Sequence, residues 1–184
     1  MARLLLVVGQ ELQTQRSALV KFLDTQGYDI TLVSSYIEAV QKLETEKFER
    51  LITSLFPPES PEENVGETGE KLIRFLKEID VGSELQQPFS CGSAPLGLRI
   101  WAAAFAKGTP ALIIYEGNRY AGDGAFVRYA LAERTGIFLE RITAFIDGKE
   151  DWINVIASSL EKLREDAKEI LFVDLETREE IFGV

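Results

Sequence analysis

The chain has 184 residues, 46% of them hydrophobic, and a formal net charge of −10 with a pI near 4.7. That length can bury a sizeable core in one domain, and the negative charge disfavours binding to the phosphates of nucleic acids. Histidine is absent, which removes the commonest general base and the commonest transition-metal ligand.

The sequence also indicates a compartment. The single cysteine, Cys91, cannot form an internal disulfide, which suits a reducing cytoplasm. The apolar run at the N-terminus is too short to span a bilayer and lacks a small-residue cleavage site, so we predict a first strand there and not a signal peptide. No later run is long enough for a membrane span. We therefore expect a cytoplasmic protein with no membrane partner.

Three strand-like segments lie in the first 55 residues. The continuous apolar stretch Leu4–Val8 predicts a central strand that is covered on both faces. Two shorter strands are predicted over 29–33 and 51–55, and each of the three is separated from the next by a segment with helical spacing.

The two intervening segments carry helix signals. We predict a helix over 12–26 that ends at Gly27, a residue typical of helix carboxyl ends. Ser35 and Glu38 have the spacing of a capping box, so a second helix is predicted to begin after Ser35. Its predicted buried face is formed by Ile37, Val40 and Leu43.

Residues 57–94 interrupt the alternation of strands and helices. The segment begins with Pro57 and Pro58 and carries eight acidic side chains against three basic ones, which is half of the net charge of the chain. Apolar residues at helical spacing predict one amphipathic helix over about 68–79. Connections of this length are usually functional or disordered, so this acidic insertion is a candidate contact surface.

The alternation resumes at Pro95, which suits the first position of a helix. The apolar residues around Trp101 predict that this helix is deeply buried. Alternating strands and helices predict a parallel sheet with right-handed connections. The predicted elements are helices over 96–107, 125–134 and 151–166 and strands over 110–115 and 141–146.

Residues 167–184 extend beyond the last predicted helix. Within this C-terminal extension, residues 170–173 are strand-like. Two interpretations remain open: an extra strand or arm that packs on its own domain, or an arm that pairs with a second subunit, as in a homodimer, or with another partner, by strand addition or swapping.

Several segments match the pattern of one known family. They are Arg3-Leu-Leu-Leu-Val-Val8, Gly27-Tyr-Asp-Ile30, Ser35-Tyr-Ile-Glu-Ala-Val-Gln-Lys-Leu43, Leu51-Ile-Thr-Ser-Leu-Phe-Pro57 and Gly108-Thr-Pro-Ala-Leu-Ile-Ile-Tyr115. Over about residues 3–165 the chain resembles the receiver domain of bacterial response regulators. The resemblance implies a domain over 1–166 with a doubly wound α/β fold, whose five-stranded parallel sheet has the flavodoxin-like order 2-1-3-4-5.

The residues that carry receiver chemistry are replaced. A receiver is phosphorylated on an aspartate at the end of its third strand, and the matching residue here is Ser54. A serine can neither form an acyl phosphate nor act as an anionic magnesium ligand. The acidic pair after the first strand corresponds to Gly9 and Gln10, or to Gln10 and Glu11, so that at best Glu11 is retained.

Two further positions differ from the family. The hydroxyl residue that ends the fourth strand corresponds to Tyr115, and the lysine after the fifth strand corresponds to Asp147, unless a shift of two residues brings in Lys149. Glu11 and Asp147 alone are too little for a metal site. The resemblance therefore implies a degenerate pseudo-receiver with no catalytic residues, no metal and no cofactor.

We expect a stand-alone, non-phosphorylatable pseudo-receiver that is not an enzyme and acts in two-component signalling by docking on another protein. In receivers the fourth helix, fifth strand and fifth helix carry partner contacts, which by resemblance indicates residues 125–166. A third possibility is a structural subunit that uses the insertion and the extension. The alternative is a small-molecule sensor or an unrecognised enzyme at the carboxyl-terminal edge of the sheet, where Gly9, Gln10, Glu11, Ser54, Tyr115 and Asp147 would lie.

Overall fold

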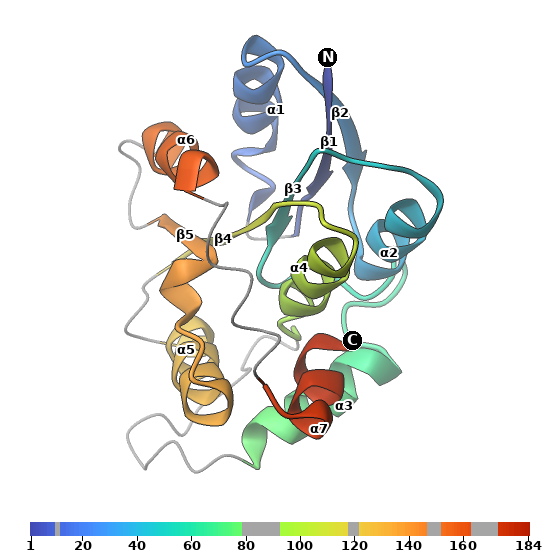
Figure 1. The fold of residues 1–184 in the computed structure, drawn as a ribbon, viewed down its shortest axis with the longest axis vertical. Helices are drawn as coiled ribbons and strands as arrows, with labels where there is room; N and C mark the ends of the chain where they lie inside the picture. Colours follow the sequence, from blue (N-terminus) through green and yellow to red (C-terminus); the bar gives the residue numbers. More distant parts are fainter. Residues whose placement is uncertain (10–11, 79–92, 118–121, 147–151, 163–172) are drawn as a thin grey trace.

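The computed structural model of the chain describes residues 1–9, 12–78, 93–117, 122–146, 152–162 and 173–184 (Figure 1). These residues form a five-stranded sheet in which every neighbouring pair of strands is parallel. The order β2-β1-β3-β4-β5 confirms the predicted doubly wound α/β fold. The strands are β1 (Ala2–Val7), β2 (Tyr28–Val33), β3 (Arg50–Ser54), β4 (Ala111–Glu116) and β5 (Thr143–Ile146).

Helices cover both faces of the sheet. On one face, α1 and α6 pack against Leu4 and Leu6 of β1, and on the other face α2, α4 and α5 share a core with Leu5 and Val7. Because side chains alternate along a strand and both faces are covered, β1 reads as a continuous apolar run. The helices are α1 (Arg16–Thr25), α2 (Tyr36–Thr45), α4 (Gly97–Ala106), α5 (Gly122–Thr135) and α6 (Trp152–Lys162), and a short 3-10 turn, η3 (Leu139–Arg141), precedes β5.

A further layer lies outside α4 and is built from two segments far apart in the sequence. One is α3 (Glu67–Lys77) from the insertion, and the other is the C-terminal segment, residues 173–184, which forms α7 (Leu175–Thr177) and the π-helix η5 (Arg178–Phe182). They lie side by side next to α4 (Figure 1). Covered from both sides, α4 is apolar almost all round, and the predicted burial of Trp101 is confirmed.

The described residues of the C-terminal extension are helical and pack on their own chain. The predicted strand over 170–173 lies, apart from Val173, outside the described residues. Asp174 caps α7, since its carboxylate accepts the Thr177 N–H at 2.9 Å. Within the described ranges, no helix is both long and apolar enough to cross a membrane.

The start of α1 differs from the prediction. The helix begins at Arg16 and not at residue 12. Tight turns precede it, in which the Leu12 N–H donates to the Gly9 carbonyl and the Gln15 N–H to the Leu12 carbonyl, both at 3.2 Å. The apolar Leu12 is buried as predicted, but it belongs to this turn.

The predicted capping box of α2 is confirmed. The Glu38 N–H donates to Ser35 Oγ at 3.3 Å, and the Ser34 N–H donates to the Glu38 carboxylate at 3.0 Å. Hydrogen bonds to the Glu38 carboxylate, from the Ser34 backbone first and then from the Ser34 and Ser35 hydroxyls, hold the pKa of Glu38 below its ordinary value. The predicted burial of Ile37 is wrong: its side chain is 41% exposed, and the fully buried residues of α2 are Ala39 and Leu43.

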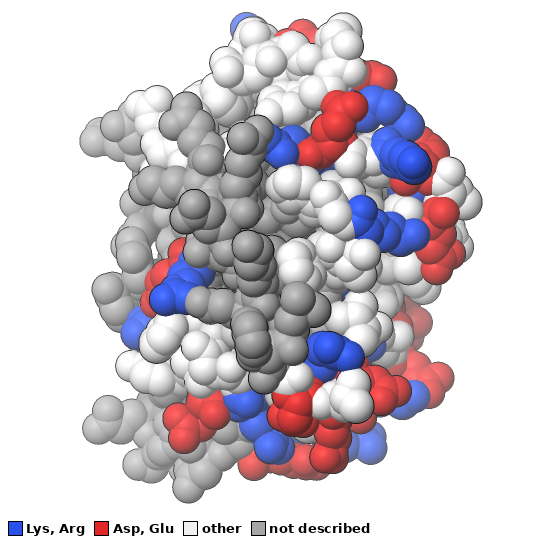
Figure 2. Space-filling model, viewed as in Figure 1, with Lys and Arg blue, Asp and Glu red and all other residues white. Residues whose placement is uncertain are grey.

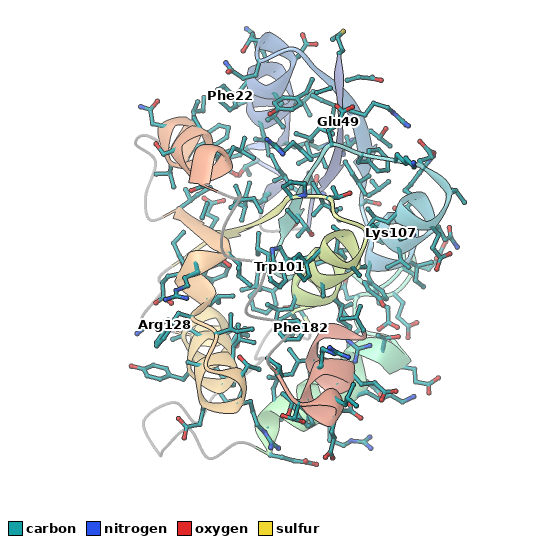
Figure 3. All side chains as sticks on the ribbon, viewed as in Figure 1. Phe22, Glu49, Trp101, Lys107, Arg128 and Phe182 are labelled. Atoms are coloured by element: carbon teal, nitrogen blue, oxygen red, sulfur yellow. The ribbon has the colours of Figure 1, made fainter. Side chains whose placement is uncertain are left out.

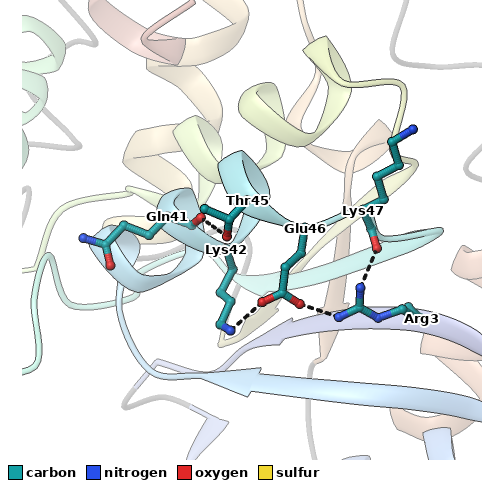
Figure 4. A network of polar contacts seen from close by, with 6 residues as sticks. All are labelled: Arg3, Gln41, Lys42, Thr45, Glu46 and Lys47. Atoms are coloured by element: carbon teal, nitrogen blue, oxygen red, sulfur yellow. Dashed lines mark hydrogen bonds and ion pairs between the residues drawn. The ribbon is translucent and has the colours of Figure 1, made fainter.

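A polar network joins the start of β1 to the end of α2 (Figure 4). The Arg3 guanidinium forms an ion pair with Glu46 and donates to the Lys47 carbonyl, and Lys42 Nζ lies 2.6 Å from the Glu46 carboxylate. The hydrogen bond from Lys42, and then that from Arg3, hold the pKa of Glu46 below its ordinary value. The network lies at the amino-terminal edge of the sheet, away from the strand ends where receivers carry their chemistry, and exposed pairs of this kind contribute little stability.

Candidate functional site

Ser54 lies at the end of β3 and is fully buried. Its Oγ accepts the Gly9 N–H and donates to the Val7 carbonyl at 3.2 Å. Both partners belong to the end of β1 and the residues directly after it. The side chain therefore joins two neighbouring strand ends through buried hydrogen bonds.

The first turn of α4 closes over this strand end. The Gly97 N–H donates to the Leu55 carbonyl at 3.0 Å. A Cβ atom built on Gly97 would lie 2.1 Å from the Ser54 carbonyl oxygen, so only glycine allows this approach of helix to strand. Pro95 and Leu96, which precede Gly97, are buried as well. The residue at the family's phosphoacceptor position is thus enclosed by backbone.

Tyr115 lies at the end of β4, opposite Phe145 of β5. Its ring makes edge contacts with Phe56 and Phe145 at centroid distances of 5.8 and 5.9 Å. The ring also lies against the backbone at Gly124 and Gly117, where an added Cβ would lie 2.4 Å from Tyr115 Cε1 and 2.7 Å from its hydroxyl oxygen. An aromatic cluster therefore occupies the place where a receiver has a small hydroxyl side chain.

The predicted site residues are brought together only in part. Gly9 and Ser54 are in direct contact, and Tyr115 lies one strand further along the same edge. Gln10, Glu11 and Asp147 lie outside the described residues. Among the residues that the structure describes, no three or more His, Cys, Asp and Glu side chains gather where they could hold a metal ion. The sequence did not indicate one polar contact at this edge, in which Gln15 Nε2 donates to Glu116 Oε1 at 2.9 Å.

Glu59 is the buried charged residue that the sequence did not single out. Its carboxylate accepts the N–H groups of Gly66, Thr68 and Gly69 at 2.9, 3.0 and 2.7 Å, the free donors at the start of α3. Gly66 and Gly69 permit this approach, because a Cβ on either would lie within 3.1 Å of the carboxylate. The sequence signal for this cap was a pair of glycines, Gly66 at the N-cap and Gly69 in the first turn of the amphipathic helix.

The same loop also caps α2. The Tyr36 N–H donates to the Pro58 carbonyl at 2.8 Å, and the Ile37 N–H donates to the Glu59 carbonyl at 3.0 Å. The insertion therefore begins as an ordered loop that satisfies the first turns of two helices. Around α3, acidic and basic side chains lie next to one another (Figure 2), as in the 2.7 Å pair of Lys71 and Glu67. In the described part of the insertion, the surface of α3 therefore carries both acidic and basic side chains.

Aromatic and arginine side chains gather on the outer side of α5 and η3. Tyr129 is 47% and Phe138 54% exposed. The Arg128 guanidinium lies 5.0 Å from the Tyr129 ring centroid, and that of Arg141 lies 5.9 Å from Phe138. Arg128 also pairs with Glu140 at 2.7 Å and lies next to α5 (Figure 3). We call these five residues the α5–η3 face.

No protein-family model and no curated protein sequence matches the chain. Solved structures do match. The signal receiver domain of a modulated diguanylate cyclase from Desulfovibrio desulfuricans G20 is 12% identical, with a TM-score of 0.50 over 91% of this chain and 97% of that one. That of an HD domain-containing protein from Pseudomonas fluorescens Pf-5 is 15% identical, with a TM-score of 0.49 over 91% and 97%.

A third similar structure is the signal receiver domain of a putative Luxo repressor protein from Vibrio parahaemolyticus, 16% identical, with a TM-score of 0.48 over 93% of this chain and 96% of that one. The strand order and the likeness to the Desulfovibrio domain define the class: the chain has the receiver-type, flavodoxin-like α/β fold. At these identities the likeness concerns the fold.

Proposed function

We propose that the chain is a receiver-type docking module that is not switched by phosphorylation at the end of β3. The observation that carries this proposal is the environment of Ser54. Its side chain is fully buried, its hydroxyl is bonded to Gly9 and Val7, and the first turn of α4 lies against its backbone. This residue holds two strands together and has no carboxylate to phosphorylate.

Phosphoryl transfer to a receiver needs more than an acceptor atom. The incoming phosphoryl group must reach the acceptor in line, and its charge must be neutralised by a cation or by cationic side chains. At Ser54, the backbone at Gly97 occupies the space next to the strand end, and Tyr115 replaces the small hydroxyl residue. Both features disfavour the transfer step itself, independently of the missing aspartate.

Docking is supported by the α5–η3 face. Tyrosine and arginine are among the residue types that most often dominate protein–protein binding energy, and this face has an exposed tyrosine with an arginine against its ring and a second exposed aromatic side chain. The face also coincides with the partner-binding region that the family resemblance implies for residues 125–166. We propose that a signalling protein binds there.

A small-molecule sensor at the edge of the sheet is less well supported. Such a sensor needs a cavity beside Gly9, Ser54 and Tyr115. Instead, Tyr115 packs between Phe56 and Phe145, and Ser54 is enclosed. These contacts leave less room for a ligand beside Ser54 and Tyr115 and therefore favour the docking proposal.

The absence of phosphorylation is tested by incubating the chain with acetyl phosphate and Mg²⁺ and measuring its intact mass. We expect no covalent phosphate adduct, while an active receiver domain in the same buffer gains one. An acid-stable adduct would indicate a hydroxyl group, and an acid-labile, hydroxylamine-sensitive adduct would indicate a carboxylate. Either adduct would contradict the proposal.

The docking proposal is tested by placing a photo-crosslinking amino acid at Tyr129 in the full chain, in its native cells. We expect a specific crosslinked protein that is lost when Phe138→Ala is added. A crosslinker at Lys21, exposed on α1, is the matched control and is expected to give none. Equal crosslinking from both positions, or none from Tyr129, would contradict the assignment of this face.

A further inference from the structure

The C-terminal segment is held against α3 and α4 mainly by two side chains. Ile181 and Phe182 are fully buried and join the same core as Leu72 of α3 and Trp101 of α4. The rings of Trp101 and Phe182 lie 6.1 Å apart, centroid to centroid, and the two side chains face each other across the contact (Figure 3). We call the surface formed by Leu72, Leu76, Arg99 and Trp101 the α3–α4 face.

Arg99 adds a polar contact that recognises backbone and not side chains. Its guanidinium donates to the carbonyls of Glu180 at 2.7 Å and Glu179 at 3.5 Å, near the carboxyl end of η5. The Glu179 carbonyl also accepts the Gly183 N–H at 2.9 Å, so Arg99 is its second donor, and a cation is favourable at this carboxyl end of the helix. Gly183, at φ +71°, ends the helix close to Arg99, since a Cβ there would lie 3.3 Å from Nη1.

The C-terminal segment is capped by one of its own residues and is buried by two helices, α3 and α4. Asp174 caps α7 from within the segment, and the contacts that bury Ile181 and Phe182 come from helices that end at Lys77 and Ala106. The α3–α4 face therefore selects a short helical turn with an adjacent Ile–Phe pair, just as a helix-binding surface selects a partner helix.

The contact between the C-terminal segment and the α3–α4 face leaves some buried polar atoms without a hydrogen-bond partner. Among the described residues, the buried side-chain polar atoms without a hydrogen-bond partner are Arg99 Nε, Arg178 Nε and Thr143 Oγ1. The first two belong to opposite sides of this one contact. Buried donors without an acceptor carry an unmatched desolvation cost, and a short segment held by few anchors opens more easily than the central sheet.

We propose that the α3–α4 face is a binding site for a short helical segment, and that the C-terminal segment of a second copy of this chain binds there in exchange for its own. A second copy carries the same Ile–Phe pair and the same helix-end carbonyls, so the exchange preserves each contact. The segment on the same chain competes through its high effective concentration. This proposal is independent of docking through the α5–η3 face.

The test uses full-length chains and a labelled synthetic peptide of residues 173–184. Phe182→Ala in the full chain weakens the internal occupant and leaves the face intact. We expect the peptide to bind this variant at least about tenfold more tightly than the wild-type chain, measured by fluorescence anisotropy. A peptide carrying the same Phe182→Ala change is expected not to bind. Tyr129→Ala in the full chain is the matched control and is expected to bind the peptide like wild type.

A folded Phe182→Ala chain that does not bind the peptide would overturn the proposal. If that variant does not fold, hydrogen exchange of the backbone amides of the wild-type chain tests whether the C-terminal segment can be displaced. Hydrogen exchange of η5 amides before those of β3 supports a displaceable segment, and simultaneous exchange overturns the proposal.

Analytical sedimentation tests whether a second copy binds. A dimer fraction that grows with protein concentration and is dispersed by excess peptide supports the swapping of C-terminal segments between two copies. A chain that is monomeric above the dissociation constant of the peptide contradicts it.

Discussion

At the scale of single residues, the hydroxyl group of Ser54 has a structural role, at the position that the family resemblance matches with the phosphorylated aspartate. It accepts the Gly9 N–H and donates to the Val7 carbonyl, and the site is fully buried. Removing such a side chain takes away the acceptor of the buried Gly9 N–H and one donor to the Val7 carbonyl. The residue therefore contributes to the connection of β1 with β3.

We expect Ser54→Ala to lower the free energy of unfolding by about 1–3 kcal/mol, the cost of leaving a buried polar group unsatisfied. Ser54→Asp is expected to cost more, because it buries a carboxylate that faces the Val7 carbonyl oxygen. Urea unfolding measures both. Ser17→Ala, exposed on α1, is the control and is expected to change stability by less than about 0.5 kcal/mol. A Ser54→Asp chain as stable as wild type would mean that the site is open.

Glu38 gives a second prediction at this scale, with a definite pH dependence. Hydrogen bonds from Ser34 hold its folded-state pKa below the ordinary value of 4.5. A lowered pKa means that the ionised carboxylate stabilises the fold above pH 4.5, and that this contribution is lost as the pH falls through the folded-state pKa.

We therefore expect Glu38→Gln to be less stable than wild type at about pH 7, and the difference to shrink toward about pH 3. Urea unfolding at both pH values measures this. Glu44→Gln, on the same helix and exposed, serves as the control. A difference that does not change between the two pH values would show that the carboxylate charge has no part in the cap.

At the scale of secondary-structure elements, Glu59 organises the insertion. Three backbone N–H groups at the start of α3 donate to its carboxylate, and the same loop offers two carbonyls to the start of α2. A single buried charge thus sets the position of α3 relative to α2. Because α3 and α4 both contact η5, this charge also supports the layer that the C-terminal segment completes.

Replacing Glu59 with alanine is expected to cost more than about 2 kcal/mol, since charged acceptors form the stronger hydrogen bonds and three donors lose their partner. Amide exchange is expected to show the loss of protection first in α3. Glu62→Ala, in the same loop and exposed, is expected to leave both quantities unchanged. Unaltered protection of α3 in Glu59→Ala would mean that other contacts position this helix.

At the scale of the whole molecule, the central sheet and the helix α3 could be predicted from the sequence, and the packing of α3 with the C-terminal segment could not. Strands covered on both faces leave continuous apolar runs such as Leu4–Val8, and their order follows from the family pattern. The carboxyl ends of parallel strands meet at one edge of the sheet, so the sequence could also predict that Gly9 and Ser54 lie close together.

The remaining features depend on partners that are remote in sequence. Glu59 reads as one more solvated acid in an acidic segment, because its partners are backbone N–H groups without a signature of their own. Ile181 and Phe182 are compatible with a strand until the α3–α4 face is known. The ring of Tyr115 is placed by Phe56 and Phe145, whose meeting depends on the fold.

The central claim is that the end of β3 is closed to phosphoryl groups, and NMR of the ¹⁵N-labelled full chain tests it most directly. Amide shifts of Gly9, Ser54 and Leu55 are recorded while Mg²⁺ and beryllofluoride, a mimic of a bound phosphoryl group, are added. We predict no saturable change at these three amides. A saturable shift that requires both Mg²⁺ and beryllofluoride would show a working receiver site and contradict the account.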